Sequence, residues 1–90
     1  MKLLFCLECQ DVIRIFPKEI RQCRCGKVRG GYLDDGLNAE YSGESAVPLA
    51  FLNSSFGKAV AYRPQKGEGL RFEAFVVPVK CDSFIKKEKL

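Results

Sequence analysis

The chain has 90 residues, of which 47% are hydrophobic and 29% are charged, and its formal net charge is +4. This composition predicts a small folded domain, because disordered chains carry fewer apolar residues and a larger net charge. The charge is too small for a strongly basic nucleic-acid-binding protein. No apolar run approaches the roughly 20 residues of a membrane-spanning helix, so no membrane partner is expected.

The first residues differ from a secretory signal peptide. Only Leu3, Leu4 and Phe5 are apolar before Cys6, whereas a secretory core needs about 7–15 apolar residues. We therefore expect a reducing, cytoplasmic environment. In such an environment clustered cysteines are more often metal ligands than disulfides.

Four of the five cysteines lie within the first 25 residues, as the pairs Cys6/Cys9 and Cys23/Cys25. Two such pairs on separate turns can surround one zinc ion with four thiolates. This site would be closed to substrates, so the zinc would be structural. Disulfide or redox use and unpaired core cysteines remain alternatives, although a redox Cys-x-x-Cys normally opens a helix and a strand-like segment follows Cys9. Cys81 is expected to pack as a small buried apolar residue.

Apolar alternation and β-branched or aromatic residues predict five strands, at residues 12–16, 27–33, 37–41, 46–52 and 70–79. Asp34-Asp35-Gly36 predicts a tight turn between the second and third strands. Gly30-Gly31 indicates a bulge or the close approach of another segment. Pro48 would place its strand at a sheet edge or displace the start of that strand. The last segment is apolar on both sides from Ala74 onward, which predicts a central strand, half exposed at its start and buried at its end.

One segment changes to a helical pattern. Asn53-Ser54-Ser55 offers N-cap residues and Pro64 provides a stop, so we expect a helix over residues 54–63. Phe56 and Val60 would lie on one face of this helix.

These elements predict a β-rich α+β fold, in which an N-terminal zinc-bound β-hairpin packs on a small antiparallel sheet with one short helix. The hairpin would comprise residues 1–31, and the sheet and helix residues 32–85 of the same domain. Residues 86–90 would form a frayed tail.

The cysteine pairs, with Gly26 and Lys27 after the second, resemble a zinc ribbon, a metal-held hairpin found in many transcription, translation and ribosome-associated proteins. The resemblance covers about 30 residues and implies a structural zinc but no activity, because zinc ribbons serve many functions. The second pair is one residue shorter than usual, and Gln10 stands where the first knuckle normally has glycine. The rest of the chain is similar to small uncharacterised bacterial or phage proteins, which implies no activity.

Two groups of side chains are candidate binding surfaces. A polar stretch could orient and anchor a protein partner, and its candidate residues are Tyr32, Asp34, Asp35, Asn38, Glu40 and Tyr41. The basic residues of the hairpin could track phosphates, and they are Arg14, Lys18, Arg21, Arg24, Lys27 and Arg29. For each group, a solvated surface without a partner is the alternative interpretation.

The chain contains no histidine, which excludes Ser-His, Cys-His and His-based metal chemistry, so we expect no enzymatic activity. The expected function is a zinc-stabilised binding module that recognises a protein or associates with itself. The alternative is a nucleic-acid-binding zinc ribbon that uses the basic face. Residues 1–31 carry a net charge of +4, residues 32–69 carry −2 and residues 70–90 carry +2.

Overall fold

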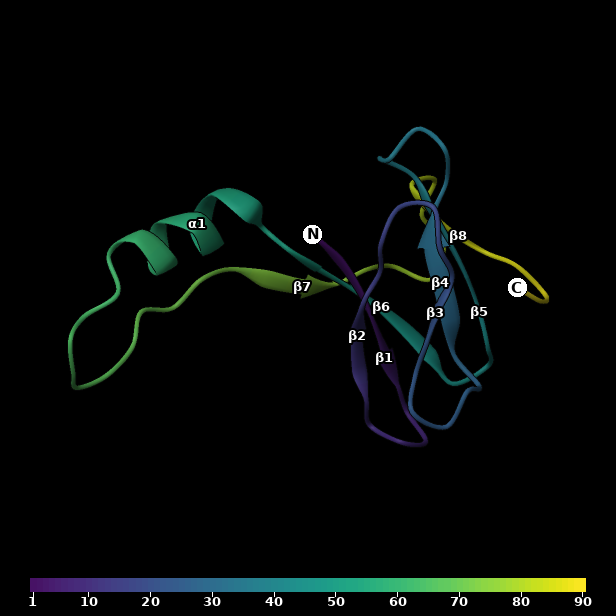
Figure 1. Ribbon diagram of the computed structural model, residues 1–90, viewed down its shortest axis with the longest axis horizontal. Helices are drawn as coiled ribbons and strands as arrows, with labels where there is room; N and C mark the ends of the chain where they lie inside the picture. Colours follow the sequence, from purple (N-terminus) through teal and green to yellow (C-terminus); the bar gives the residue numbers. More distant parts are fainter.

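The computed structural model describes residues 1–90 and has the expected β-rich α+β fold, with eight short strands in two sheets and one helix (Figure 1). The elements in chain order are β1 Lys2–Cys6, β2 Val12–Arg14, β3 Arg21–Gln22, β4 Arg29–Tyr32, β5 Ala39–Ser42, β6 Ala46–Phe51, α1 Asn53–Ala61, β7 Ala74–Val76 and β8 Phe84–Lys86. The helix lacks the length and the apolar run that crossing a bilayer requires.

The first sheet has the strand order β2-β1-β6-β7, and all its pairs are antiparallel. Strand β1 was not predicted, although it is apolar at Leu3 to Phe5 and pairs with both β2 and β6. Strand β6 is internal and begins at Ala46, so Pro48 neither marks a sheet edge nor displaces the start of its strand, and the expectation was wrong. The proline is tolerated because β7 pairs with β6 only from Leu49 onward, and at Pro48 only the carbonyl is used, accepting a hydrogen bond from Val77 N at 3.0 Å.

The second sheet has the order β3-β4-β5-β8. Its first two pairs are antiparallel, but β8 runs parallel to β5, which differs from the expected all-antiparallel sheet. Lys87 N continues this pairing by donating to Tyr41 O at 2.7 Å. The first residues of the expected frayed tail are therefore attached to the sheet.

The two sheets enclose one core of ten buried residues, and both sheets contribute to it. They are Leu4, Cys6, Ile13, Ile15, Cys23, Val28, Ala39, Tyr41, Val77 and Phe84. A Cβ atom on Gly30 would lie 2.5 Å from Leu4 Cδ1, so the absence of a side chain lets β4 approach β1. This is the close approach that the glycine pair predicted.

Residues 1–31 do not form one independent hairpin. Strands β1 and β2 belong to the first sheet, whereas β3 and β4 belong to the second. The zinc-ribbon-like segment is thus divided between the two layers of the fold.

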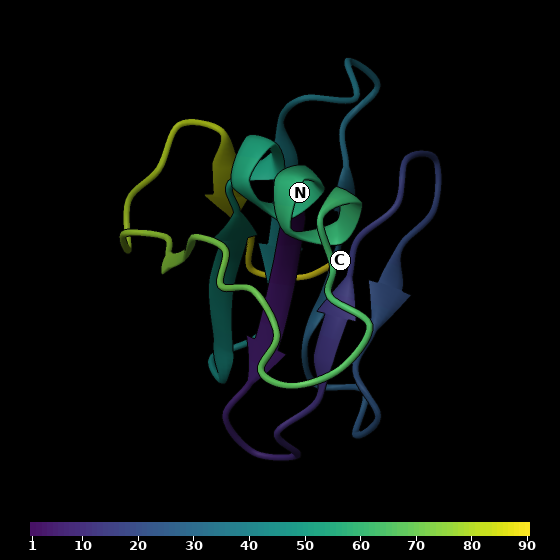
Figure 2. The ribbon, with the colours of Figure 1, turned by 90° about the vertical axis from the view of Figure 1, so that its left-hand side faces the viewer.

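Helix α1 and the loop after it project from the sheets, and we call residues 52–73 the arm (Figures 1 and 2). The radius of gyration is 14.3 Å, whereas a compact chain of this length would have about 12 Å. No residue from 52 to 76 is buried. The helix begins and ends within two residues of its predicted bounds, yet it contributes nothing to the core.

Strand β7 differs from its prediction in length and in burial. It spans three residues rather than ten, lies at the edge of the first sheet and is exposed throughout. The prediction failed because an apolar run indicates only that both faces of the strand favour contact with other apolar groups. It does not indicate that these groups belong to the same chain.

Candidate metal centre

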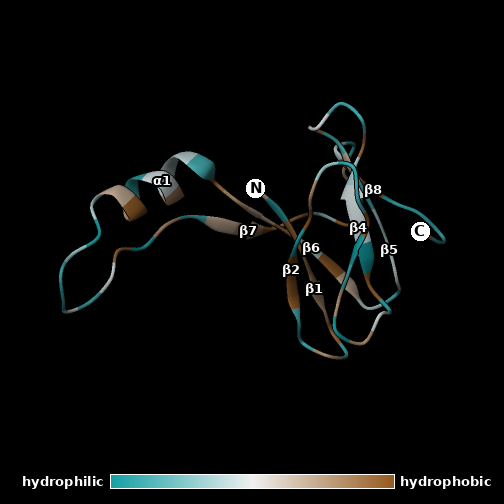
Figure 3. Cartoon of the chain, viewed as in Figure 1, coloured by the Kyte–Doolittle hydropathy of each residue, from teal (hydrophilic) through white to brown (hydrophobic).

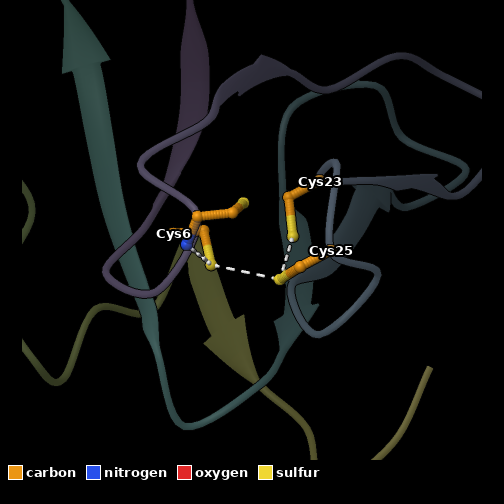
Figure 4. A group of neighbouring side chains, drawn as sticks. Cys6, Cys23 and Cys25 are labelled. Atoms are coloured by element: carbon orange, nitrogen blue, oxygen red, sulfur yellow. Dashed lines mark hydrogen bonds between the residues drawn. The ribbon is translucent and has the colours of Figure 1, made fainter.

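Two turns bring the cysteine pairs together between the sheets. Cys6 ends β1 and Cys9 lies in the turn before β2, while Cys23 follows β3 and Cys25 lies in the turn before β4. Figure 4 shows the sulfur atoms of Cys6, Cys23 and Cys25 pointing toward one another from these separate segments. A metal ion held here would join the first sheet to the second.

The spacing of the four sulfur atoms fits a tetrahedral metal site. All four lie within 4.8 Å of one another. The Cys6–Cys25 sulfur distance is 3.7 Å and the Cys23–Cys25 distance is 3.4 Å. Four sulfurs placed 2.3 Å from a zinc ion would be about 3.8 Å apart, whereas a disulfide would need about 2.05 Å. All five cysteines are free thiols, so the cluster has the separation of ligands and not of a disulfide.

Both turns adopt the sharp backbone that a metal knuckle requires. Gly26 has φ 80°, and Gln10, in the corresponding place of the first turn, has φ 59°. The side chain at Gln10 therefore does not prevent the left-handed conformation. Backbone amides also reach the sulfurs, because Cys9 N donates to Cys6 Sγ at 3.5 Å and Val28 N donates to Cys23 Sγ at 3.4 Å. Such donors stabilise thiolates.

The thiols affect one another's protonation. Burial acts to raise the pKa of Cys9, but the backbone amides of Cys25 and Asp11 and the neighbouring thiols outweigh it and lower this pKa to about 6. The backbone amide of Lys27 acts to lower the pKa of Cys25, but Cys23, burial and the other sulfurs outweigh it and raise this pKa to about 12. Four sulfurs so close together cannot all ionise without a compensating cation. A divalent metal ion would supply that charge.

Charged side chains beside the cluster connect the two turns. Lys27 Nζ lies 2.9 Å from Glu8 Oε1, and Ser45 Oγ donates to Glu8 Oε2 at 2.9 Å. The hydrogen bond to Glu8 and the nearby sulfurs raise the pKa of Lys27. Arg24 Nη2 donates to Cys9 O at 3.2 Å. Arg24 and Lys27 therefore lie next to the cluster, where their positive charges would offset the negative charge of a metal–thiolate unit.

Cys81 lies outside the cluster. It is partly buried and packs against the core, with its sulfur 3.4 Å from Ser83 Oγ. Cys81 thus packs against the core as predicted, but it is only partly buried.

The polar stretch does not form a single exposed surface. Tyr41 is only 4% exposed and packs edge-on against Phe84 in the core, so its assignment to a binding surface was wrong. Asp35 is occupied in its own turn, where its carboxylate accepts hydrogen bonds from Leu37 N and Asn38 N at 2.9 Å. Tyr32 Oη accepts a hydrogen bond from Lys2 N at 3.3 Å. Asp34 is exposed, whereas Glu40 is half-buried on β5.

The basic residues fall into two groups. Lys27 and Arg24 lie beside the cysteines, as described above. Arg14 and Arg21 lie against the ring of Phe16, with their guanidinium carbons 4.7 and 4.6 Å from its centre. Both guanidinium groups therefore pack on an aromatic ring of the same segment.

The two remaining basic residues belong to neither contact set. Lys18 is exposed and has φ 63°. Arg29 is half-buried on β4, and its Nε atom is buried without a hydrogen-bond partner.

Apolar residues of the arm and of β7 were not recognised as a candidate surface from the sequence. Eight of the thirteen large hydrophobic side chains that are exposed lie between residues 52 and 79. Figure 3 shows apolar stretches on β7 and at the far end of α1. The sequence did contain a signal for this surface, because the apolar segment at residues 70–79 directly follows a loop at residues 65–69 that has no apolar residue.

No protein-family model, curated protein or solved structure matches this chain. The resemblance to a zinc ribbon therefore rests on the cysteine geometry. That geometry defines a cluster of four thiols compatible with a bound metal ion.

Proposed function

We propose that this chain is a zinc-stabilised, non-enzymatic binding module that recognises a protein through its arm and the adjoining strand β7. The observation that carries this proposal is the arm itself, in which an amphipathic helix projects from the core with no buried residue. The cysteine cluster supports the zinc part of the proposal, and the exposed apolar side chains support the protein partner.

Zinc is the metal that this donor set favours. Soft thiolate ligands in a tetrahedral arrangement are typical of structural zinc. Cys6, Cys9, Cys23 and Cys25 would hold the ion, and when bound it would link the two turns and compensate the charge of the thiolates. With all four positions filled by the protein, the site would be structural and would not activate water.

A protein partner is favoured by the chemistry of the arm. An isolated helix of nine residues is marginal in water, because helices shorter than about 12–15 residues gain most of their stability from packing. Here the helix packs on a small aromatic cluster, with ring centres 4.8 Å apart for Phe56 and Phe72 and 5.4 Å apart for Phe51 and Phe56. Hydrogen bonds from Glu73 N to Ser55 Oγ at 2.8 Å and from the N-terminus to Asn53 Oδ1 at 2.7 Å also attach it. Contiguous exposed apolar residues of this kind mark protein interaction sites.

Nucleic-acid binding through the basic face is the weaker alternative. Lys27 is paired with Glu8 and Arg21 lies 3.8 Å from Glu19. These acidic partners reduce the positive charge available to phosphates. The arm, by contrast, exposes the apolar side chains of Leu52, Val60, Tyr62, Leu70 and Phe72.

Elemental analysis tests the zinc part of the proposal. We expect one zinc ion per chain, and removal of the ion by a chelator should abolish cooperative thermal unfolding, because in such sites the free energy of metal binding is folding free energy. Cys9→Ser should lose zinc and melt at a markedly lower temperature.

Cys81→Ser is the matched control, because it removes a thiol outside the cluster and should retain zinc. A purified protein without zinc would contradict the proposal. So would a Cys9→Ser variant as stable as the wild type.

A further inference from the structure

Strand β7 presents a free backbone edge. Leu52 N donates to Glu73 O at 2.9 Å and Val77 N donates to Pro48 O at 3.0 Å, so the odd-numbered residues of this segment bond to β6. In an antiparallel pair the backbone groups of alternate residues point away from the partner strand. The N–H and C=O groups of Ala74 and Val76 therefore face outward, where the sheet has no further strand.

This edge is the one edge of the fold without a charged residue. Both sheets end in short strands, and three of these four edge strands carry a basic side chain, namely Arg14 in β2, Arg21 in β3 and Lys86 in β8. Charges on an edge strand protect it against pairing with another chain. Strand β7, with the sequence Ala-Phe-Val, has no such protection.

An apolar groove of about 240 Å³ lies beside the free edge, and it is lined by Leu49, Phe51, Ala74, Phe75 and Val76. Exposed apolar side chains also occur along the arm, at Leu52, Val60, Tyr62, Leu70 and Phe72. A standard protein interface buries about 800 Å² on each partner, so a stable contact here would use the arm as well as the groove.

We propose that the partner bound by this surface is a second copy of the chain, paired antiparallel across β7 about a two-fold axis that passes beside Phe75. This inference rests on the proposed protein-binding function and names its partner. The pairing joins the first sheets of the two copies into one continuous sheet. The two grooves then form a single apolar face under the two arms.

The register follows from the backbone directions. Because Ala74 and Val76 point outward, Ala74 of one copy bonds to Val76 of the other, and Phe75 lies opposite its own counterpart. That central position is a non-hydrogen-bonded pair, where side chains are closest and aromatic pairs stabilise a sheet. Glu73 faces Val77 in this register, so no like charges oppose each other. A strand that satisfies both its backbone and its side chains against itself favours a second copy over an unrelated partner.

Sedimentation velocity of the zinc-loaded full chain tests the proposal over protein concentrations from about 1 to 100 µM. The wild type should sediment with the mass of a dimer at the upper end of this range. Val76→Pro should raise the dimer dissociation constant at least tenfold, which corresponds to a loss of about 1.4 kcal/mol in the free energy of association. The reason is that proline removes an outward N–H without removing a bond to β6. Phe75→Lys should do the same by placing two like charges at the axis.

Leu37→Lys is the matched control, because it replaces an exposed apolar residue in the turn between β4 and β5 and should leave the dimer unchanged. Zinc content and melting temperature are measured on every sample, so that a variant that has unfolded is recognised. If Val76→Pro fails to fold, Phe75→Lys decides, since it leaves the backbone unaltered.

A wild type that stays monomeric overturns the dimer, and so does a dimer that both variants leave intact. If the wild type is monomeric but folded and carries zinc, the proposed function survives with a different protein as partner. A protein that carries no zinc contradicts the proposed function instead, whatever its oligomeric state.

Discussion

Gln10 adopts a left-handed backbone conformation that residues other than glycine usually avoid. Its φ is 59°, and its N–H donates to Cys6 O at 2.8 Å, which closes the first cysteine turn. A left-handed residue with a Cβ costs about 1–2 kcal/mol, whereas glycine costs about 0.5–1 kcal/mol in lost chain entropy. We therefore expect Gln10→Gly to raise the free energy of unfolding by about 0.5–1 kcal/mol, measured by urea denaturation of the zinc-loaded protein.

Gly26→Ala provides the opposite test in the second turn. A Cβ there would have only Gln22 Nε2 nearby, at 3.8 Å, so the cost would come from the backbone alone. We expect a loss of about 1 kcal/mol. If Gln10→Gly destabilised the protein, the first turn could not have the left-handed geometry described above.

At the scale of single residues, the sequence was most informative where chemistry is local. The cysteine spacing predicted the cluster, whereas Gln10 was noted only as a departure from the usual knuckle glycine. Tyr41 was misassigned because a shift of one residue along a strand moves a side chain to the other face. Asp35 was read as part of a surface because a sequence does not show that a turn already satisfies its carboxylate.

Gly43 decides whether the turn between β5 and β6 can form. It has φ 116°, and a Cβ there would lie 2.3 Å from Lys27 O, a backbone atom that cannot move aside. Gly43→Ala should therefore destabilise the protein by more than about 3 kcal/mol, or prevent folding, as judged by thermal unfolding and zinc content.

Gly36→Ala separates the backbone cost from the clash. Gly36 also has a positive φ, of 69°, but a Cβ there would meet nothing within 4 Å. It should cost only about 1–2 kcal/mol. Equal losses for the two variants would show that no close approach exists at Gly43.

At the scale of elements, the segments flanked by clear turn or cap residues were predictable, whereas β1 and the shortest strands were not. The helix and the strands around the Asp34–Gly36 turn follow from residue type and turn chemistry. Strands β3 and β8 have two and three residues, which is too short for a period to be visible. Strand β8 also pairs in parallel with β5, more than forty residues away in the chain. Only tertiary packing reveals such a partner.

At the scale of the whole molecule, the cysteines do more than close a hairpin. A single hairpin over residues 1–31 would require β2 to pair with β3. Instead β2 pairs with β1 and β3 pairs with β4, so the two cysteine turns belong to different sheets. A zinc ion here would hold two layers together, and the close approach of Gly30 to Leu4 explains why the layers can meet. The sequence contains the ligands but not this arrangement, which depends on contacts distant in the chain.

The arm is separable from the core in this architecture. Leu52 N donates to Glu73 O at 2.9 Å, so these residues form a hydrogen-bonded antiparallel pair, and an Asn-Gly turn can replace residues 53–72 between them without moving either strand. None of the ten core residues lies in the replaced segment. We expect the shortened protein to bind one zinc ion and to unfold cooperatively, with a melting temperature within about 5 °C of the wild type.

Paired alanine substitutions test the same separation in the full chain. Phe84 is 2% exposed in the core, so Phe84→Ala should cost about 3–5 kcal/mol in the free energy of unfolding. Phe56 packs outside the buried core, against Phe72 of the arm and Phe51 at the end of β6. In the monomer Phe56→Ala should therefore lower the free energy of unfolding much less than Phe84→Ala does. Unfolding is measured by circular dichroism at low protein concentration, where the monomer predominates. If the shortened protein lost its zinc, or if both alanine variants were equally destabilised, the arm would be part of the folding core rather than a surface that the core presents.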